Sequence, residues 1–148
     1  MPKLTGLVRH PLCEDELTRR IIGACFRVAN GLGHGFPEAV YSNALMLELR
    51  DEELEARRQV PLTVCYRGVT VGEFLADVVV ESRVILELKS VSCLLTEHQT
   101  QLINYLTATG YDTGLLINFG CPKLEYKRCR PRTRDADVTS ESVDPDSP

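Results

Sequence analysis

The stretch FLADVVVESRVILELKS, residues 74–90, constrains the fold of this chain more than any other segment. It is typical of two strands joined by the polar turn at residues 81–83. The runs VVV before the turn and VIL after it are continuously apolar, which indicates strands that are buried on both faces. The segment therefore predicts a sheet covered by helices on both sides. It also sets three charged residues, Asp77, Glu87 and Lys89, into what is otherwise core sequence.

The register of this hairpin predicts that the two acids meet. If the two strands pair around the three-residue turn, Asp77 lies directly opposite Glu87, with the Cβ atoms about 5 Å apart. Two like charges at that distance repel, so the pair needs a proton or a cation. The two-residue period of the second strand puts Lys89 on the same face as Glu87. We therefore expect two acids and a lysine at one spot on the sheet.

The other elements complete the order α-α-β-β-β-α-β-β. Amphipathic spacing predicts the helices, and the glycine-rich NGLGHG and Gly110 mark where two of them end. Thr96 with Gln99 predicts a capping box for the third helix. The predicted helices are residues 14–30, about 37–56 and 96–110. The predicted strands are residues 59–66, 69–80, 84–90, 113–119 and 123–130. The economical packing of this order is an α/β (α+β) domain with a central mixed β-sheet flanked by helices.

Composition divides the chain into three parts. We expect a folded domain at residues 14–130, preceded by an N-terminal extension, residues 1–13. Residues 131–148 are poor in apolar side chains and are predicted to form a disordered acidic tail. The chain carries a net charge of −4, and the tail holds five acids against two arginines. The rest of the chain is therefore close to neutral and ends in the basic KLEYKRCR, which permits a phosphate-bearing partner without demanding one.

Several classes of protein are disfavoured by composition. No apolar run approaches the length of a membrane-spanning helix, and the first residues contain no apolar core of a secretion signal. We therefore expect a cytoplasmic protein that does not enter a membrane. The six cysteines include no CxxC pair and are expected to be reduced thiols. A zinc site built from Cys93, His98, Cys121 and Cys129 would fit no usual ligand spacing.

Two helices carry further polar candidates. Glu38 lies in the first turn of the second helix, where the helix dipole favours an ionised carboxylate, and Tyr41 follows one turn later. On the third helix His98, Gln101 and Tyr105 form a polar stripe beside an apolar one. Each of these residues also has a structural interpretation: Glu38 as a favourable first-turn acid, Tyr41 as a core aromatic residue, and the stripe as the exposed face of a helix.

In combination these segments resemble a known family. GFPEAVYSNAL, RRQVPLTVCYRG, FLADVVVESRVILELKSV, HQTQLINYLTATG, GLLINFG and EYKR occur in the order found in the GxxExxY proteins. Gly35, Glu38 and Tyr41 satisfy the motif that names that family. The resemblance covers about residues 14–130. The GxxExxY proteins are assigned to the PD-(D/E)XK nuclease-like superfamily.

The resemblance implies a restriction-endonuclease-like core and a site. Asp77 matches the first acid of the motif, with an alanine before it where the superfamily name has proline. Glu87 and Lys89 match the E-x-K, Glu38 the helical acid, and Gln101 the glutamine often found on the following helix. The implied activity is divalent-metal-dependent hydrolysis of DNA or RNA, with Mg²⁺ or Mn²⁺ held by Asp77, Glu87 and Glu38. Three further side chains are candidate substrate contacts: Tyr41, His98 and Tyr105.

Other interpretations remain open at this stage. Asp77, Glu87 and Lys89 could form a structural ion triad, or could lie on a charged strand face that meets water. The domain could be a non-catalytic nuclease-fold module that binds nucleic acid or a protein partner. It could also hydrolyse a small phosphorylated substrate. Specificity would come from a partner, from a homodimer, or from the loops at residues 31–36 and 90–95.

Overall fold

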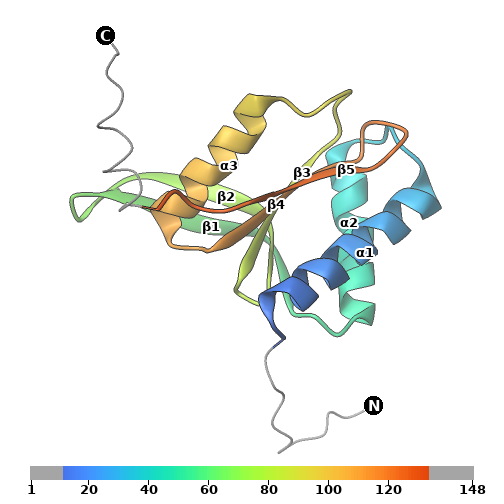
Figure 1. Ribbon diagram of the computed structural model, residues 1–148, viewed down its shortest axis with the longest axis horizontal. Helices are drawn as coiled ribbons and strands as arrows, with labels where there is room; N and C mark the ends of the chain where they lie inside the picture. The colour runs from blue at the N-terminus through green and yellow to red at the C-terminus, as the bar shows by residue number, and fades with distance from the viewer. Residues whose placement is uncertain (1–11, 134–148) are drawn as a thin grey trace, which may run out of the picture.

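The computed structural model describes residues 12–133, and its elements follow the predicted order (Figure 1). The helices of this part of the chain are α1 (Glu14–Leu32), α2 (Glu38–Asp51) and α3 (Thr96–Thr109). The strands are β1 (Ala56–Tyr66), β2 (Val69–Val80), β3 (Val84–Lys89), β4 (Thr113–Asn118) and β5 (Glu125–Cys129). They form a sheet in the order β1-β2-β3-β4-β5, with β3 and β4 parallel and the other neighbours antiparallel. The predicted α+β fold with a mixed sheet is confirmed.

Helices cover both faces of the sheet, and the core is accordingly divided in two (Figure 1). Leu86 and Leu88 of β3 pack with α1 and α2 on one face. Ile85 packs with Leu102 and Leu106 of α3 on the other. All of these side chains are at most 2% exposed. The continuous apolar run in β3 is therefore explained by burial on both sides, as predicted.

One irregularity interrupts the alternation of β2. Ala76 packs on the α3 side of the sheet, whereas Val78 packs on the α1–α2 side, although a two-residue period would give them the same face. Opposite this point in β1, Gln59 has a φ of 52°. The pairs on either side of Gln59 and Asp77 are formed, but these two residues themselves are not paired. The ladder between β2 and β3 also ends here, at Val78 opposite Leu86. At Asp77 the alternation of β2 side chains between the two faces of the sheet is therefore shifted by one residue.

The second helix is shorter than predicted. It ends at Asp51 rather than near Ala56, and β1 already begins at Ala56. The chain leaves the helix through Glu53, which has a φ of 61°, and the N–H of Leu54 donates to the carbonyl of Leu49 at 3.0 Å. Leu54 is thereby buried against the core. A non-glycine residue in the left-handed region is an uncommon helix terminator, so no local signal marked this end.

A buried amide organises the carboxyl ends of β3 and β4. Asn118 is 0% exposed, and its Oδ1 accepts from the N–H groups of Val91 and Gly120, both at 2.9 Å. Its Nδ2 donates to the carbonyl of Val91 at 2.9 Å and to Glu125 Oε1 at 3.0 Å. The loop after β3 and the loop after β4 are therefore held together by one side chain. At Gly120 the two backbones approach so closely that a Cβ would lie 2.2 Å from the backbone N and O of Val91.

The ends of the described region bear on two further expectations. The backbone N–H of Arg132 donates to Thr107 Oγ1 at 3.0 Å, and its Nη1 donates to Asn104 Oδ1 at 2.6 Å. Residue 132, in the first part of the predicted tail, thus contacts α3. The remainder of the predicted tail and residues 1–11 of the extension lie outside the described residues. All six cysteines are free thiols. Among the described helices, none has the length and apolar character required to cross a bilayer.

The close approach at Gly120 makes a stability prediction. Gly120→Ala should lower the free energy of unfolding by about 3 kcal/mol. The added methyl group would collide with backbone atoms of Val91, which cannot move aside as a flexible side chain can. Gly31→Ala, within α1, is the matched control: its Cβ would meet nothing within 4 Å, and alanine favours a helix over glycine. Urea denaturation of the three proteins measures the difference. Equal midpoints for Gly120→Ala and Gly31→Ala would contradict the close contact.

Candidate functional site

The site forms where β2 separates from β3. Beyond the last pair, Val78 opposite Leu86, side-chain carboxylates take over the contacts that the ladder no longer makes. Asp77 Oδ2 accepts from the backbone N–H of Leu88 at 2.8 Å, and the N–H of Asp77 makes a long contact of 3.5 Å to Glu87 Oε2. Each acid is therefore bound to the backbone of the opposite strand. We call the point where these strands part the β2–β3 fork.

The predicted register of the hairpin is confirmed. Val80 lies opposite Val84, which leaves residues 81–83 as the loop. Continuing that register brings Asp77 and Glu87 together at the fork, although the regular pairing stops one residue earlier. The meeting of the two acids could therefore be read from turn length and strand period alone.

Both acids are held in surroundings that disfavour their charge. Burial raises the pKa of Asp77, and the N–H of Leu88 with the charges of Lys89 and Arg58 partly offsets that increase. The pKa of Glu87 rises from its ordinary 4.5 to about 8, because the carboxyl is buried and because Asp77 lies beside it. With a pKa of about 8, the carboxyl of Glu87 is therefore largely protonated near neutral pH.

Lys89 lies beside the acids without pairing with either. Its charge lowers the pKa of both Asp77 and Glu87. Within residues 12–133, however, no ion pair joins Lys89 to a carboxylate. The carbonyl of Lys89 accepts from the N–H of Phe119 at 2.8 Å, so its backbone is fixed against β4 while its ammonium group is not. A closed structural triad of two acids and a lysine is therefore not what the described residues form.

A cavity of about 200 Å³ adjoins the fork on the α2 side of the sheet. Glu38 and Ser42 line it from α2, Arg58 and Gln59 from β1, and Asp77 from β2. Glu38 also raises the pKa of Glu87 through its charge, so both other predicted acids act on Glu87. Ser42, Arg58 and Gln59 were not predicted. Ser42 could have been found, since it follows Glu38 by one helical turn and shares its face. Nothing in the strand pattern distinguished the other two.

Tyr41 does not line the cavity. It is 0% exposed and stacks on Phe119, with ring centroids 4.4 Å apart. Its hydroxyl donates to the carbonyl of Gly33 at 2.7 Å and accepts from the N–H of Phe36 at 3.1 Å. The expectation of a substrate contact at Tyr41 is therefore corrected: a fully buried phenol cannot reach a substrate, and it instead holds the loop before α2.

The same loop is also fixed from β3. Ser90 Oγ donates to the carbonyl of Phe36 at 2.5 Å. Since Ser90 directly follows Lys89, this bond joins the end of the E-x-K strand to the loop that begins α2. Glu38 is the first residue of that helix and is exposed. The position of Glu38 relative to the fork is therefore set by Tyr41 from one side and by Ser90 from the other.

The candidates on α3 lie apart from the cavity. His98 and Gln101 line a separate open depression on the outer face of the helix. His98 Nδ1 accepts from the N–H of Leu95 at 3.1 Å, so the capping contact predicted for Thr96 and Gln99 is made one residue earlier. Gln101 Nε2 donates to the hydroxyl of Tyr105 at 3.1 Å, and the ring of Tyr105 stacks on Phe74. The described contacts do not join these residues to the two acids.

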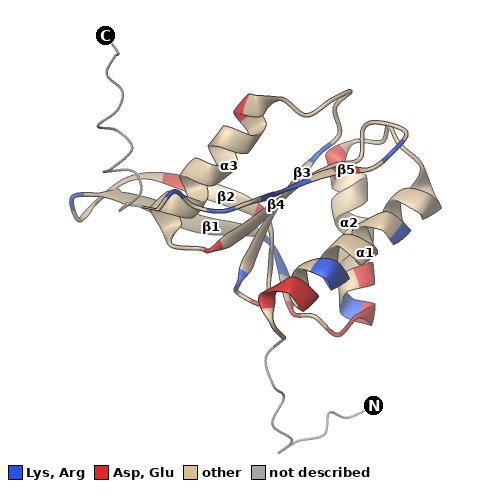
Figure 2. Cartoon of the chain, in the orientation of Figure 1, with Lys and Arg blue, Asp and Glu red and all other residues tan. Residues whose placement is uncertain are grey.

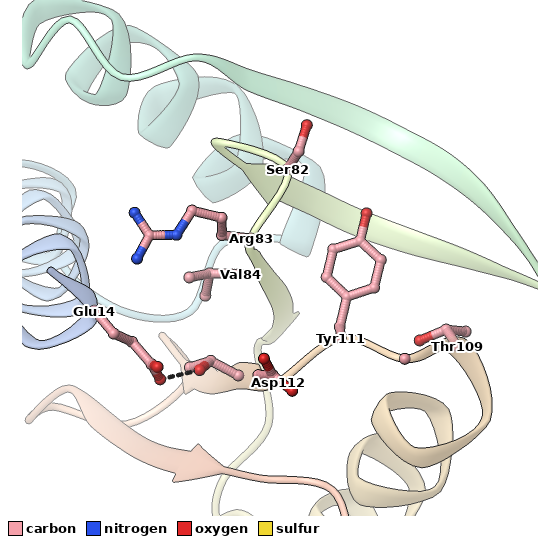
Figure 3. Close-up of a pocket in the computed structure, with 9 residues that line it drawn as sticks. Glu14, Ser82, Arg83, Val84, Thr109, Tyr111 and Asp112 are labelled. Carbon is pink, nitrogen blue, oxygen red and sulfur yellow. Dashed lines mark hydrogen bonds between the residues drawn. The ribbon is translucent and has the colours of Figure 1, made fainter. Parts of the chain in front are cut away.

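A larger cavity, of about 420 Å³, lies at the opposite end of β3 and β4 (Figure 3). Its principal charged groups already have partners. Glu14 accepts from the Thr113 hydroxyl and pairs with Arg130 at 2.9 Å, and Arg83 donates to the carbonyl of Leu12 at 2.7 Å. Figure 3 shows the guanidinium of Arg83 directed away from Asp112. Because these groups satisfy one another, the smaller cavity at the fork is the better candidate for chemistry.

Two arginines at the carboxyl end of β5 and just beyond it pair with acids of α1. Arg128 pairs with Asp15 at 2.9 Å and Arg130 pairs with Glu14 at 2.9 Å. Figure 2 shows acidic positions at the start of α1 and basic positions along β5. Two of the four basic residues in the cluster predicted to permit a phosphate-bearing partner thus fasten the edge strand to α1.

The donor set at the fork suits a hard divalent cation. Within the described residues, no three His, Cys, Asp or Glu side chains converge closely enough to form a complete site by themselves. Mg²⁺ does not need one, since proteins usually hold it by one or two carboxylates together with waters and substrate phosphate oxygens. Asp77 and Glu87 supply two such carboxylates. The hydroxyl of Ser42 lies in the same cavity and is buried without a hydrogen-bond partner among the described residues.

The raised pKa of Glu87 predicts a pH dependence of stability in the metal-free protein. Between about pH 4.5 and pH 8 the folded state holds a proton that the unfolded state releases, so stability should fall as pH rises, by up to about 1.4 kcal/mol per pH unit. Glu87→Gln should flatten most of this slope, leaving a smaller part from Asp77. Urea denaturation in EDTA across this range measures it. Glu73→Gln, an exposed acid on β2, is the control and should retain the wild-type slope.

Comparison with known proteins identifies the fold and the family of the chain. No curated protein matches the chain. One solved structure, the crystal structure of SSO0001, superposes with a TM-score of 0.52 at 18% sequence identity, over 87% of this chain and 64% of that one. That likeness shows the fold, and this chain spans less than two thirds of the other protein. A family model described as PD-(D/E)XK nuclease superfamily matches residues 15–129. The acids and lysine of the fork lie within that match, and the chain belongs to the PD-(D/E)XK nuclease superfamily.

Proposed function

We propose that this chain is a divalent-metal-dependent nuclease that hydrolyses phosphodiester bonds in DNA or RNA. The observation that carries the proposal is the fork itself. Two half-buried acids, both with raised pKa values, lie beside an unpaired lysine and next to a cavity that a third acid lines. A purely structural role would have satisfied these charges internally. Perturbed acids that converge on a cavity are typical of catalytic sites.

Asp77 and Glu87 would hold Mg²⁺ or Mn²⁺, and metal dependence is typical of this superfamily. The bound ion would polarise a phosphoryl oxygen and lower the pKa of a coordinated water. Glu38 is more exposed and acts on Glu87 only through its charge, so its role would be an outer one, reached through water. Binding a cation would release the proton held by Glu87, because the ligand form is the carboxylate.

Lys89 would act on the reacting groups. Its ammonium group is a mobile cation that no carboxylate of the described residues neutralises. It would orient the attacking water and offset the negative charge that develops on the phosphoryl oxygens in the transition state. The fixed backbone of Lys89 against Phe119 keeps the base of this side chain in place. Gln101, Tyr105 and His98 would contact a longer substrate from α3, outside the cavity.

The finer assignment to the GxxExxY proteins belongs to the same proposal. It is supported by the spacing of Gly35, Glu38 and Tyr41 and by the order of the segments that carry the resemblance. The competing proposal is a non-catalytic module of the same fold. The pairing of the β5 arginines with α1 favours that alternative, because it leaves little basic surface for a long nucleic acid.

The metal-binding part is tested by Asp77→Asn. Asparagine keeps an acceptor for the Leu88 N–H and removes a partly buried charge that disfavours ionisation of Glu87. The metal-free variant should therefore be as stable as the wild type or more so. Mn²⁺ at about 100 times its dissociation constant should stabilise the wild type by about 2.7 kcal/mol and leave the variant unchanged. Thermal melts of both proteins with Mn²⁺ and with EDTA measure this. A variant that is destabilised and insensitive to metal, beside a wild type that is also insensitive, would contradict the proposal.

The catalytic part is tested by Lys89→Gln. This variant should retain Mn²⁺ binding by calorimetry and lose cleavage by about 100- to 1,000-fold, since an electrostatic contact to the transition state is removed. Plasmid DNA, single-stranded DNA and single-stranded RNA serve as substrates with Mg²⁺ or Mn²⁺. Lys127→Gln, an exposed lysine on β5, is the matched control. A wild type that binds Mn²⁺ and cleaves none of these substrates would favour the non-catalytic module.

A further inference from the structure

The cavity at the fork contains more than the residues of the proposed metal site. Its walls on α2 and β1 carry a cation, Arg58, and an unpartnered buried hydroxyl, that of Ser42. We propose that Arg58 and Ser42 form the substrate-phosphate subsite of this centre, in which they bind the non-bridging oxygens of a phosphodiester. This inference rests on the proposed function and adds the residues that hold the substrate.

Arg58 is held in place without being neutralised. Its Nη1 donates to Asn43 Oδ1 on α2 at 2.5 Å, and Asn43 is a neutral amide. Among residues 12–133, Arg58 makes no ion pair with a carboxylate. A guanidinium has five N–H donors, so most of them remain available beside the cavity. An arginine that is anchored and still fully charged is suited to bind a phosphate oxygen.

The neighbouring arginine shows the contrast. Arg57 lies one position earlier on β1 and pairs with Glu55 at 3.6 Å. It does not line the cavity. Since successive residues of a strand point to opposite faces, the sheet separates the two arginines. Arg58 also lowers the pKa of Asp77 through its charge, so it acts electrostatically on the acids of the fork. A phosphate in the cavity would therefore lie between a cation and the proposed metal ligands.

Ser42 supplies an independent observation. Its hydroxyl is the one buried side-chain N or O atom of the described residues that lacks a hydrogen-bond partner, and the residue is 6% exposed. A serine inside a helix usually bonds to the carbonyl one turn earlier, and this one does not. A buried hydroxyl without a partner costs about 1–3 kcal/mol, so such groups require an explanation. A ligand oxygen in the cavity that Ser42 lines would provide its partner.

The backbone at Gln59 supports the same conclusion. Gln59 has a φ of 52°, a region that non-glycine residues rarely occupy, and it is unpaired opposite Asp77. Such strain persists where the surrounding structure requires it, and it is often found at functional sites. Here the break lets residues 58 and 59 line the cavity together. β1 thereby presents Arg58, which is paired with Val78, directly beside a one-residue break in the ladder at Gln59 and Asp77.

The test measures substrate binding separately from metal binding. A short fluorescein-labelled single-stranded DNA and an RNA of the same sequence are titrated with the full chain in Ca²⁺, and fluorescence anisotropy gives Kd at several salt concentrations. Arg58→Gln should weaken binding roughly tenfold or more and reduce the slope of log Kd against log salt by about one phosphate contact. Ser42→Ala should weaken binding severalfold without loss of thermal stability. Arg57→Gln is the matched control, and Mn²⁺ affinity should be unchanged in all three variants.

The outcomes separate this inference from the proposed function. If the wild type binds Mn²⁺ and cleaves, and Arg58→Gln binds the probes as Arg57→Gln does, the phosphate subsite is wrong and the nuclease proposal stands. If Ser42→Ala only raises the melting temperature, the hydroxyl has no part in the subsite. If the wild type binds neither probe, the phosphate subsite is wrong, and the nuclease proposal is decided separately by the Mn²⁺-binding and plasmid-cleavage assays. Loss of Mn²⁺ affinity in Arg58→Gln would also overturn the inference, because it would give Arg58 a role in the metal site itself.

Discussion

The parting of β2 from β3 at Asp77 is the constraint on which the rest of this structure depends. Where two strands separate inside a core, their backbone N–H groups lose their partners and must be satisfied in another way. Here carboxylates replace the ladder: Asp77 accepts from Leu88, and the N–H of Asp77 is directed at Glu87. A requirement of the backbone thus brings two acids into the interior. The cavity, the unpaired lysine and the docking of α2 are all arranged around that point.

This arrangement is unfavourable in the isolated protein, and the unfavourable features occur together. Burial and mutual repulsion raise the pKa of Glu87 to about 8, Gln59 has a positive φ, and Ser42 has an unpartnered hydroxyl. Elsewhere, charges at the contacts between elements are paired, as in the pairing of Arg128 with Asp15. When violations of ordinary packing rules gather around one cavity, selection for a ligand explains them better than selection for stability.

The sequence predicted those features that follow from period and turn length. The three-residue turn determined the hairpin register, and continuous apolar runs indicated burial on both faces, so the meeting of Asp77 with Glu87 followed. Features that depend on tertiary approach could not be predicted. The end of α2 depends on a left-handed Glu53, and the contribution of Arg58 depends on a break in a ladder that no local pattern marks. Tyr41 was ambiguous because an aromatic residue one turn from an acid suits a core and a binding site equally well.

The structure also gives a physical reason for the spacing of Gly35, Glu38 and Tyr41. Side chains on a helix lean toward its N-terminus, so a tyrosine in the second turn can reach back to the preceding loop. The hydroxyl of Tyr41 does so, binding the backbone of that loop on both sides of Gly35, which has a φ of 101°. Glu38 emerges one turn earlier, on the face that Ser42 shares, and lines the cavity. Glycine shapes the loop, tyrosine fixes it, and the acid is thereby held at the fork. The three positions thus act together, because the buried Tyr41 fixes the loop that determines where the exposed Glu38 lies.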